Sequence, residues 1–317
     1  MSLPSVTLSP HATPVDELTR LRTALGPSCP RLFIKRDDLL SFGLGGNKVR
    51  KIQTVVAEAR AAGADTLITC GGVQSNHARV TAAAGAALGM RVILVLSGAA
   101  PAVPTANTRL DALFGADLHY VTSREERAPA MERLAESART EGRRPWIIPL
   151  GASTPIGALG FARGVVELAT SGLKPDVIVH ATSSGGTQSG LIAGCRLFGL
   201  SSLVLGVSAD DPADRLVAVI IDLLGSMAER LGAKPENVGI GREIAVDDTE
   251  VGEGYGRPTD ASTEAIELVA RREGILLDPV YTAKAMAGLI RRIRAGALSR
   301  DQSVLFWHTG GQVGYFA

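Results

Sequence analysis

The sequence predicts an α/β fold in which parallel, twisted β-sheets are flanked by helices. Short apolar runs rich in β-branched residues alternate with alanine-rich helical patterns along the 317-residue chain. Strands that are apolar at nearly every position are typical of parallel sheets covered on both faces, and each helix then serves as a right-handed crossover. About eight strands are expected, which is too many for one small sheet, so we expect two α/β units.

Each expected strand ends in small or polar residues. In chain order the strands are "RLFIKRD" (31–37), "DTLITCGG" (65–72), "RVILVLSG" (91–98), "DLHYVTS" (117–123), "RPWIIPLGAS" (144–153), "DVIVHATSSGG" (176–186), "SLVLGVSAD" (202–210) and "SVLFWHTGG" (303–311). The turn-rich "PLGASTPIGALG" (149–160) is a candidate return from one unit to the other. Ligands of open α/β folds bind outside the carboxyl ends of the strands, so we expect the segments after five of these strands to converge on one site.

Composition and charge exclude several classes of function. The net charge is +1 and aromatic residues make up 4%, so neither nucleic acid nor a membrane surface is an expected partner. The most apolar stretch is broken by Arg91 and two prolines, and no membrane span is predicted. Three widely spaced cysteines (Cys29, Cys70 and Cys195) and the lack of a signal pattern at the start favour a cytoplasmic protein without disulfides. The five histidines show no metal-ligand spacing, so no metal site is expected.

The stretch "GLGGNKVRK" (43–51) places Lys48 directly after a glycine pair and an asparagine. Glycines let the backbone approach a bound molecule closely. A reactive lysine amine needs a lowered pKa, which burial or a neighbouring cation such as Lys51 can supply. Two interpretations are open from these residues: an ordinary cationic helix start after a tight turn, or a lysine held against a ligand as a chemical reagent.

The stretch "SSGGTQSG" (183–190) joins an expected strand to a helix. Glycine, serine and threonine before a helix leave backbone N–H groups free, which suits a phosphate, although a plain strand-to-helix turn has the same composition. The stretch is neither GxGxxG nor a Walker sequence. An amine, a phosphate cradle and polar contacts for a ring together fit pyridoxal phosphate.

Three other candidates are less specific by themselves. Ser75 in "QSNHAR" (74–79) is expected to cap a helix. No GxSxG elbow accompanies it, so His77 is not expected to act as a catalytic base. On residue type alone, Tyr255 and Tyr281 are interpreted as structural, since a tyrosine beside proline usually packs and hydrogen-bonds through its hydroxyl.

Taken together, the motifs resemble the fold-type II pyridoxal-phosphate enzymes of the 1-aminocyclopropane-1-carboxylate deaminase and D-cysteine desulfhydrase family. The similarity runs in the family's order through "IKRDDLLSFGLGGNKVRK", "GGVQSNHAR", "GASTPIGALGF", "SSGGTQSG", "EGILLDPVYTAKAMAGLI" and "HTGG". The resemblance implies a large cofactor-binding domain formed by residues 1–49 and 162–317, a smaller inserted α/β domain formed by residues 50–161, and a cofactor between them. It also implies a homodimer.

The resemblance assigns roles residue by residue. Lys48 would bind the cofactor as a Schiff base, Asn76 would contact the ring's 3-hydroxyl, and Thr309 would meet the pyridine nitrogen. The phosphate would be held by Ser184, Gly185, Gly186 and Thr187. Gln74, Ser75 and Asn76 would approach the substrate, with Gln74 and Ser75 near its carboxylate. Tyr255 and Tyr281 would flank the site and act in catalysis with Lys48 and Ser75, which reverses the structural interpretation of the two tyrosines.

Two positions divide the family. The deaminases have glutamate after the "DPVY" tyrosine and glutamine after "QSN", whereas this sequence has Thr282 and His77, as in the desulfhydrase branch. The expected reaction is therefore β-elimination from a small amino acid, foremost D-cysteine to pyruvate, hydrogen sulfide and ammonia. L-cysteate sulfo-lyase and 1-aminocyclopropane-1-carboxylate deaminase activities are alternatives. An alternative of a different class is a non-catalytic protein that binds pyridoxal phosphate or another small molecule.

Overall fold

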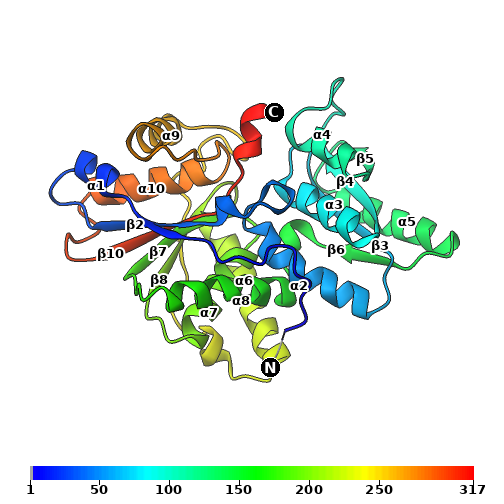
Figure 1. The fold of residues 1–317 in the computed structure, drawn as a ribbon, viewed down its shortest axis with the longest axis horizontal. Helices are drawn as coiled ribbons and strands as arrows, with labels where there is room; N and C mark the ends of the chain where they lie inside the picture. The colour runs from blue at the N-terminus through cyan, green and yellow to red at the C-terminus, as the bar shows by residue number, and fades with distance from the viewer. Residues whose placement is uncertain (1–2) are drawn as a thin grey trace.

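The computed structural model describes residues 3–317, which form two β-sheets with helices on both faces (Figure 1). The larger sheet has the strand order β1-β2-β10-β7-β8-β9, and the smaller sheet has the order β5-β4-β3-β6. Neighbouring strands are parallel except β1, which is antiparallel to β2. The predicted α/β class, with parallel sheets flanked by helices, is confirmed.

All eight expected strands are present, and the structure adds two. The strands are β1 (Val15–Glu17), β2 (Arg31–Arg36), β3 (Thr66–Gly72), β4 (Arg91–Ser97), β5 (Asp117–Val121), β6 (Pro145–Ile148), β7 (Val177–Thr182), β8 (Leu203–Ser208), β9 (Ala245–Asp247) and β10 (Ser303–His308). The two unexpected strands, β1 and β9, have three residues each and form the edges of the larger sheet. Runs this short carry no readable hydrophobic period, so the sequence pattern could not predict them.

Helices cover both faces of the larger sheet, as Figure 1 shows: α1, α9 and α10 lie on one face, and α6, α7 and α8 on the other. The helices are α1 (Thr19–Leu25), α2 (Lys48–Ala61), α3 (Asn76–Leu88), α4 (Ala106–Leu113), α5 (Arg127–Thr140), α6 (Pro155–Thr170), α7 (Gly186–Leu197), α8 (Ala213–Leu231), α9 (Asp260–Glu273) and α10 (Thr282–Arg294). In β10, Val304 and Phe306 pack toward α10, and Leu305 and Trp307 pack toward α6 and α7, as the alternation of a strand buried on both faces requires. Among residues 3–317, no helix is long and apolar enough to cross a membrane.

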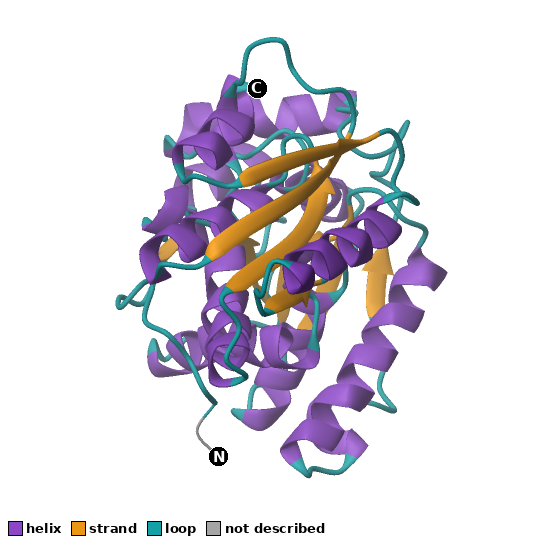
Figure 2. Ribbon diagram, turned by 90° about the vertical axis from the view of Figure 1, so that its right-hand side faces the viewer, coloured by secondary structure: helices purple, strands orange, loops and turns teal. Residues whose placement is uncertain are grey.

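The smaller sheet is packed between α2 and α3 on one face and α5 on the other. Figure 2, turned by 90°, shows the strands enclosed by helices. All four strands of this sheet lie inside the segment 50–161 that the resemblance assigns to an inserted domain. Both assigned boundaries fall inside helices, since α2 contains residues 49 and 50 and α6 contains residues 161 and 162. The division into domains stays a prediction.

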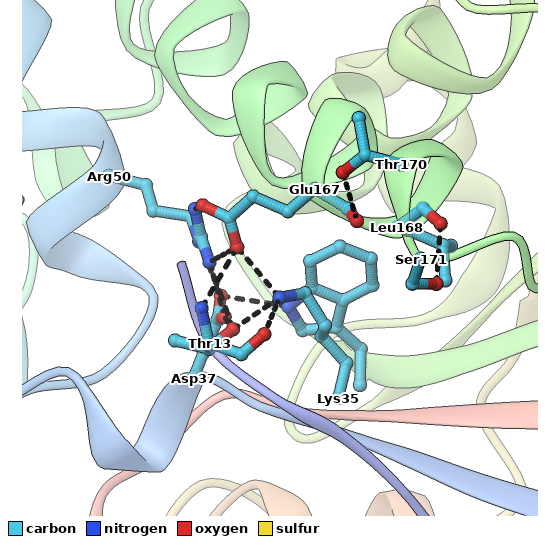
Figure 3. A network of polar contacts seen from close by, with 9 residues as sticks. Thr13, Lys35, Asp37, Arg50, Glu167, Leu168, Thr170 and Ser171 are labelled. Carbon is cyan, nitrogen blue, oxygen red and sulfur yellow. Dashed lines mark hydrogen bonds and ion pairs between the residues drawn. The ribbon is translucent and has the colours of Figure 1, made fainter. Parts of the chain in front are cut away.

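A buried network of charges joins β2, α2 and α6 beside the larger sheet (Figure 3). Arg50 donates to Asp37 Oδ1 and Oδ2 at 2.7 Å each, and to Glu167 Oε1 at 2.6 Å. Lys35 Nζ donates to Glu167 Oε2 at 2.7 Å, and the indole of Trp307 donates to Asp37 Oδ2 at 2.8 Å. Two cations and two carboxylates therefore balance inside the protein. Because Arg50 lies two residues after Lys48, the network anchors the start of α2.

Candidate active site

A cavity of about 540 Å³ lies where the carboxyl ends of strands from the two sheets meet. It gathers residues from the ends of β3, β6, β7 and β10 and, through Lys48, from the segment that follows β2, as the sequence predicted. The segment after β8, which contributes Asp210 and Asp211, was not predicted to reach the site. Of the predicted site residues, those that line it are Lys48, Ser75, Asn76, Ser184, Gly185, Thr187, Tyr255, Tyr281 and Thr309. Gln74 and Gly186 do not line it.

The glycine pair before Lys48 is required by the backbone. Residues 43–46 have positive φ values of 54°, 58°, 76° and 92°, a region that favours glycine. A Cβ on Gly45 would lie 1.9 Å from the Leu40 carbonyl oxygen, and one on Gly46 would lie 2.8 Å from the Thr309 carbonyl oxygen. The loop therefore turns tightly and packs against the end of β10, and this places Lys48 at the first position of α2, facing the cavity.

The Lys48 amine lies in surroundings that make it nucleophilic. Its Nζ donates to Asn47 Oδ1 at 3.1 Å. Burial lowers the pKa of Lys48 to about 8, and the charge of Arg79 lowers it further while Asp278 opposes the shift. The sequence predicted Lys51 as the neighbouring cation that acts on Lys48, whereas the structure gives this effect to Arg79. A substantial neutral fraction of the amine near neutral pH is what addition to an aldehyde requires.

The start of α7 also lines the cavity, and its Thr187 Oγ1 accepts from Asn47 Nδ2 at 2.9 Å. Gly185 has φ 75° immediately before the helix, whose free N–H groups suit an anion. A Cβ on Gly186 would lie 2.6 Å from Ser153 Oγ and 2.9 Å from Lys51 Nζ, so this position admits no side chain. Ser184 Oγ is 2.8 Å from Ser153 Oγ. Gly186 thus supports the cradle from behind rather than lining the cavity with a side chain.

Lys51 is a functional candidate that the sequence interpretation missed. Its side chain is fully buried, and Nζ donates only to the Gly151 carbonyl oxygen at 3.2 Å and Ser153 Oγ at 3.5 Å. Within residues 3–317 no carboxylate pairs with it, and burial together with Lys48 holds its pKa well below the usual range. A buried cation without a counter-ion beside a helix N-terminus fits a phosphate group. The spacing of three residues from Lys48, which places both on one helical face, was the available signal.

Replacing Lys51 by methionine is expected to weaken pyridoxal phosphate binding by about 10- to 100-fold, as for loss of one hydrogen bond to a charged group. The same change should raise the melting temperature of the cofactor-free protein, because it removes an unpaired buried charge. Titration of the cofactor-free protein by absorbance and thermal unfolding measure the two effects, with the exposed Lys174→Met as the control. A fall in both affinity and cofactor-free stability would show a structural lysine instead.

The polar residues at the start of α3 have different roles. Ser75 caps the helix, since its Oγ accepts from the Ala78 N–H at 3.2 Å, as predicted. His77 lines the cavity with Nε2 2.8 Å from Thr69 Oγ1, and burial holds its pKa well below the usual range, so the ring is neutral. The Gln74 side chain turns away toward α4 and accepts from the Asn107 N–H at 2.9 Å. The Gln74 side chain therefore does not point into the cavity, where it was predicted to approach the substrate.

Tyr255 and Tyr281 meet at the cavity, with their hydroxyl oxygens 2.6 Å apart and their rings edge to face. Burial raises the pKa of both hydroxyls, that of Tyr281 well above 10, and the Tyr255 hydroxyl contributes to the shift of Tyr281. Both hydroxyls are therefore protonated at neutral pH, and the pair can donate a proton.

Position 282, one of the two that divide the family, does not face the cavity. The Thr282 side chain is fully buried, and its hydroxyl lies 2.7 Å from Asp278 Oδ1 at the start of α10. The structure therefore does not place this hydroxyl in the cavity, although the comparison of the two branches would imply a role for position 282 beside a cofactor ring. The hydroxyl-bearing residue that lines the cavity at the end of β10 is Thr309.

Together these groups define an enzyme site for a phosphate-bearing aldehyde cofactor. The nucleophilic amine of Lys48 lies at the start of α2, and the Lys51 amine, one turn later, lies beside the side-chain-free Gly186 at the N-terminus of α7. Across residues 3–317, no group of three or more histidine, cysteine or acidic side chains is placed to hold a metal ion.

Comparison with known proteins gives the family. The profile of the family described as "Pyridoxal-phosphate dependent enzyme" matches residues 6–310. The chain is 38% identical to a putative 1-aminocyclopropane-1-carboxylate deaminase of Pyrococcus abyssi and 39% identical to one of Pyrococcus horikoshii, in each case over 99% of this chain and 93% of the relative. A crystal structure described as that of an ACC deaminase homologue superposes with a TM-score of 0.91 at 37% identity, covering 99% of this chain and 94% of the other. The chain belongs to the pyridoxal-phosphate-dependent enzymes of fold-type II, in the 1-aminocyclopropane-1-carboxylate deaminase family, and its cofactor is pyridoxal phosphate.

Proposed function

We propose that this enzyme catalyses β-elimination from D-cysteine, with water as co-reactant and pyruvate, hydrogen sulfide and ammonia as products. The observation that carries the proposal is the pair of protonated tyrosine hydroxyls, 2.6 Å apart, in the same cavity as the Lys48 amine. Elimination needs a base for the Cα proton and an acid for the leaving sulfur. An amine with a pKa of about 8 suits the first task, and the position of the paired hydroxyls in the cavity makes them candidates for the second.

The cofactor, held by Lys48, Lys51 and the start of α7, would supply a sink for the electron pair that the Cα proton leaves behind. Ser75, at the N-terminus of α3, would orient the substrate carboxylate. The proposal also includes the roles that the family resemblance implies for two further residues: Asn76 would contact the ring's 3-hydroxyl, and Thr309 would meet the pyridine nitrogen. The roles given to Lys48, Ser75, Tyr255 and Tyr281 are likewise part of the proposal.

A second candidate substrate is L-cysteate, which two arginines favour. Arg124 and Arg127 line the cavity, and the Arg124 guanidinium lies 5.2 Å from the centre of the Tyr255 ring. Within residues 3–317 neither forms an ion pair, and the Arg127 guanidinium donates only to Ser97 Oγ. Arg215, which also lines the cavity, is paired with Asp211 at 3.2 Å. Free guanidinium groups recognise the oxygens of a sulfonate, which would leave as sulfite.

If L-cysteate is the substrate, Arg127→Gln is expected to raise its KM by about 10-fold or more, as for loss of a hydrogen bond to a charged group. Steady-state kinetics of sulfite release measure the change. The exposed Arg133→Gln on the same helix is the control and should leave the KM unaltered. An unchanged KM in Arg127→Gln would remove the arginine from sulfonate recognition.

The proposed function is tested by supplying the purified protein and pyridoxal phosphate with D-cysteine, L-cysteine, L-cysteate or 1-aminocyclopropane-1-carboxylate, one at a time. Pyruvate with sulfide from D-cysteine alone is the expected result. Pyruvate with sulfite from L-cysteate would select the second candidate. 2-Oxobutyrate from 1-aminocyclopropane-1-carboxylate would show instead that the chain is a deaminase of that substrate. No keto acid from any of the four, with the cofactor bound, would contradict the proposed function and favour a non-catalytic binding protein.

A further inference from the structure

Arg79 is a buried arginine that the proposed reaction does not use. It lies one turn after Asn76 in α3, and its side chain is fully buried. Its Nη1 donates to Asn76 Oδ1 at 3.0 Å and to Asn107 Oδ1 at 2.6 Å. Its Nη2 donates to the carbonyl oxygen of Gly45 at 3.1 Å. One guanidinium therefore joins the start of α3, the start of α4 and the glycine loop that precedes Lys48.

This guanidinium fixes which way the Asn76 amide points. Arginine has donors and no acceptor, so only the oxygen of an amide can face it. Asn76 Oδ1 accepts from Arg79 and also from Asn107 Nδ2 at 3.2 Å. Asn76 Nδ2 must then point the other way, and no group within residues 3–317 accepts a hydrogen bond from it. Since Asn76 lines the cavity, its N–H donors are available to a molecule bound there.

Asn107 is oriented by the same guanidinium. Its Oδ1 accepts from Arg79, and its Nδ2 donates to the Gln74 carbonyl oxygen at 2.8 Å. The Gln74 carbonyl oxygen only accepts, so it requires the same orientation of Asn107 as Arg79 does. Arg79 is the member of the network that donates to both amide oxygens, and it therefore fixes Asn76 directly as well as through Asn107.

We infer that Arg79 is a positioning residue, which holds the Asn76 amide with its N–H toward the cofactor ring. This inference rests on the proposed placement of the cofactor at Lys48. Pyridoxal phosphate carries a phenolic oxygen next to the aldehyde carbon that an amine attacks, so a donor beside Lys48 meets that oxygen. A donated hydrogen bond stabilises the ionised phenolic oxygen, whereas a reversed amide would present an oxygen to it.

The test is the pH titration of the visible absorption of the cofactor-loaded protein, which follows the protonation of the bound cofactor. Arg79→Lys keeps the positive charge but lacks the planar fork that spans both amides. It is expected to raise the titration midpoint by about one to two pH units, as for loss of a hydrogen bond to a charged group. Arg91→Lys, the same change on the surface, should leave the midpoint unaltered. A wild-type midpoint in Arg79→Lys would overturn the inference.

A double-mutant cycle tests whether Arg79 acts through Asn76. Asn76→Ala should raise the midpoint by itself, and adding Arg79→Lys should then have no further effect. Additive shifts would overturn the inference and show a direct effect of the arginine charge. The titration midpoints of the single and double variants can be measured in any protein that binds the cofactor, whether or not it catalyses β-elimination. The inference about Arg79 can therefore fail while the proposed function holds.

If Arg79→Lys does not fold, the orientation of the Asn76 amide can be determined from a wild-type structure with bound cofactor and visible amide protons. Asn76 Oδ1 on Arg79 with Nδ2 on the ring oxygen supports the inference. The reversed amide overturns it.

Discussion

Replacing Lys48 by alanine is expected to lower turnover by at least about 100-fold, because in the proposed reaction the same amine would bind the cofactor covalently and serve as the base at Cα. The cofactor should still bind, more weakly, since Lys51 and the start of α7 remain. Lys48→Ala leaves the loop geometry intact because the loop depends on its glycines and on Asn47, whose N–H donates to the Thr309 carbonyl oxygen at 3.0 Å. Keto acid release per bound cofactor measures the loss.

The control for this variant is Lys174→Ala, which removes an exposed lysine far along the chain. Its turnover should equal that of the wild type. Unchanged turnover in Lys48→Ala would contradict the role given to the amine and would leave the low pKa of Lys48 without a function.

Replacing Arg50 by methionine is expected to lower the free energy of unfolding by about 3–5 kcal/mol, because it leaves the buried Asp37 without its main partner and removes one of the two cations bound to the partly buried Glu167. Asp37 is fully buried and takes two of its hydrogen bonds from this guanidinium. Denaturant unfolding of the cofactor-free protein measures the change. Arg60→Met, an exposed arginine on the same helix, should alter stability by less than about 0.5 kcal/mol. If Arg50→Met also changed the free energy of unfolding by less than about 0.5 kcal/mol, the charge network would contribute little to stability.

The same network predicts a pH dependence of stability. Arg50 and Lys35 lower the pKa of both Asp37 and Glu167 below the ordinary carboxyl values. A carboxyl whose folded pKa is depressed contributes stability above its unfolded pKa, near 4, and this stability is lost as the pH falls through the folded value. The wild type should therefore lose stability below about pH 4. Arg50→Met should lose less over the same range.

The strands could be predicted from the sequence because their signal is local. Runs such as "VIVHAT" in β7 are mostly apolar, as a strand buried on both faces requires, and all eight expected strands are present. The edge strands β1 ("VDE") and β9 ("AVD") could not be predicted, because they exist only through pairing with a neighbour already in the sheet.

The site could be predicted as a set of segments but not in its side-chain contacts. Lys48 and the start of α7 follow from glycine and helix-start patterns. The direction of Gln74 toward Asn107, and the bond of Thr282 to Asp278, depend on residues that only the fold brings near. Burial of Lys51 without a carboxylate is a tertiary property, and so is the contact of Arg79 with two asparagine amides. For Lys51 the only local signal is its spacing of three residues from Lys48, and that spacing does not show that the side chain is buried without a carboxylate.

The most direct test of the account is to reduce the cofactor-loaded protein with borohydride and to locate the bound pyridoxyl group by peptide mass spectrometry. Reduction makes the bond between the cofactor and a lysine permanent. The account predicts the added mass on the peptide that contains Lys48, and its loss from that peptide in Lys48→Ala. Modification of Lys51 in place of Lys48, or no modified lysine in a protein that binds the cofactor, would contradict it.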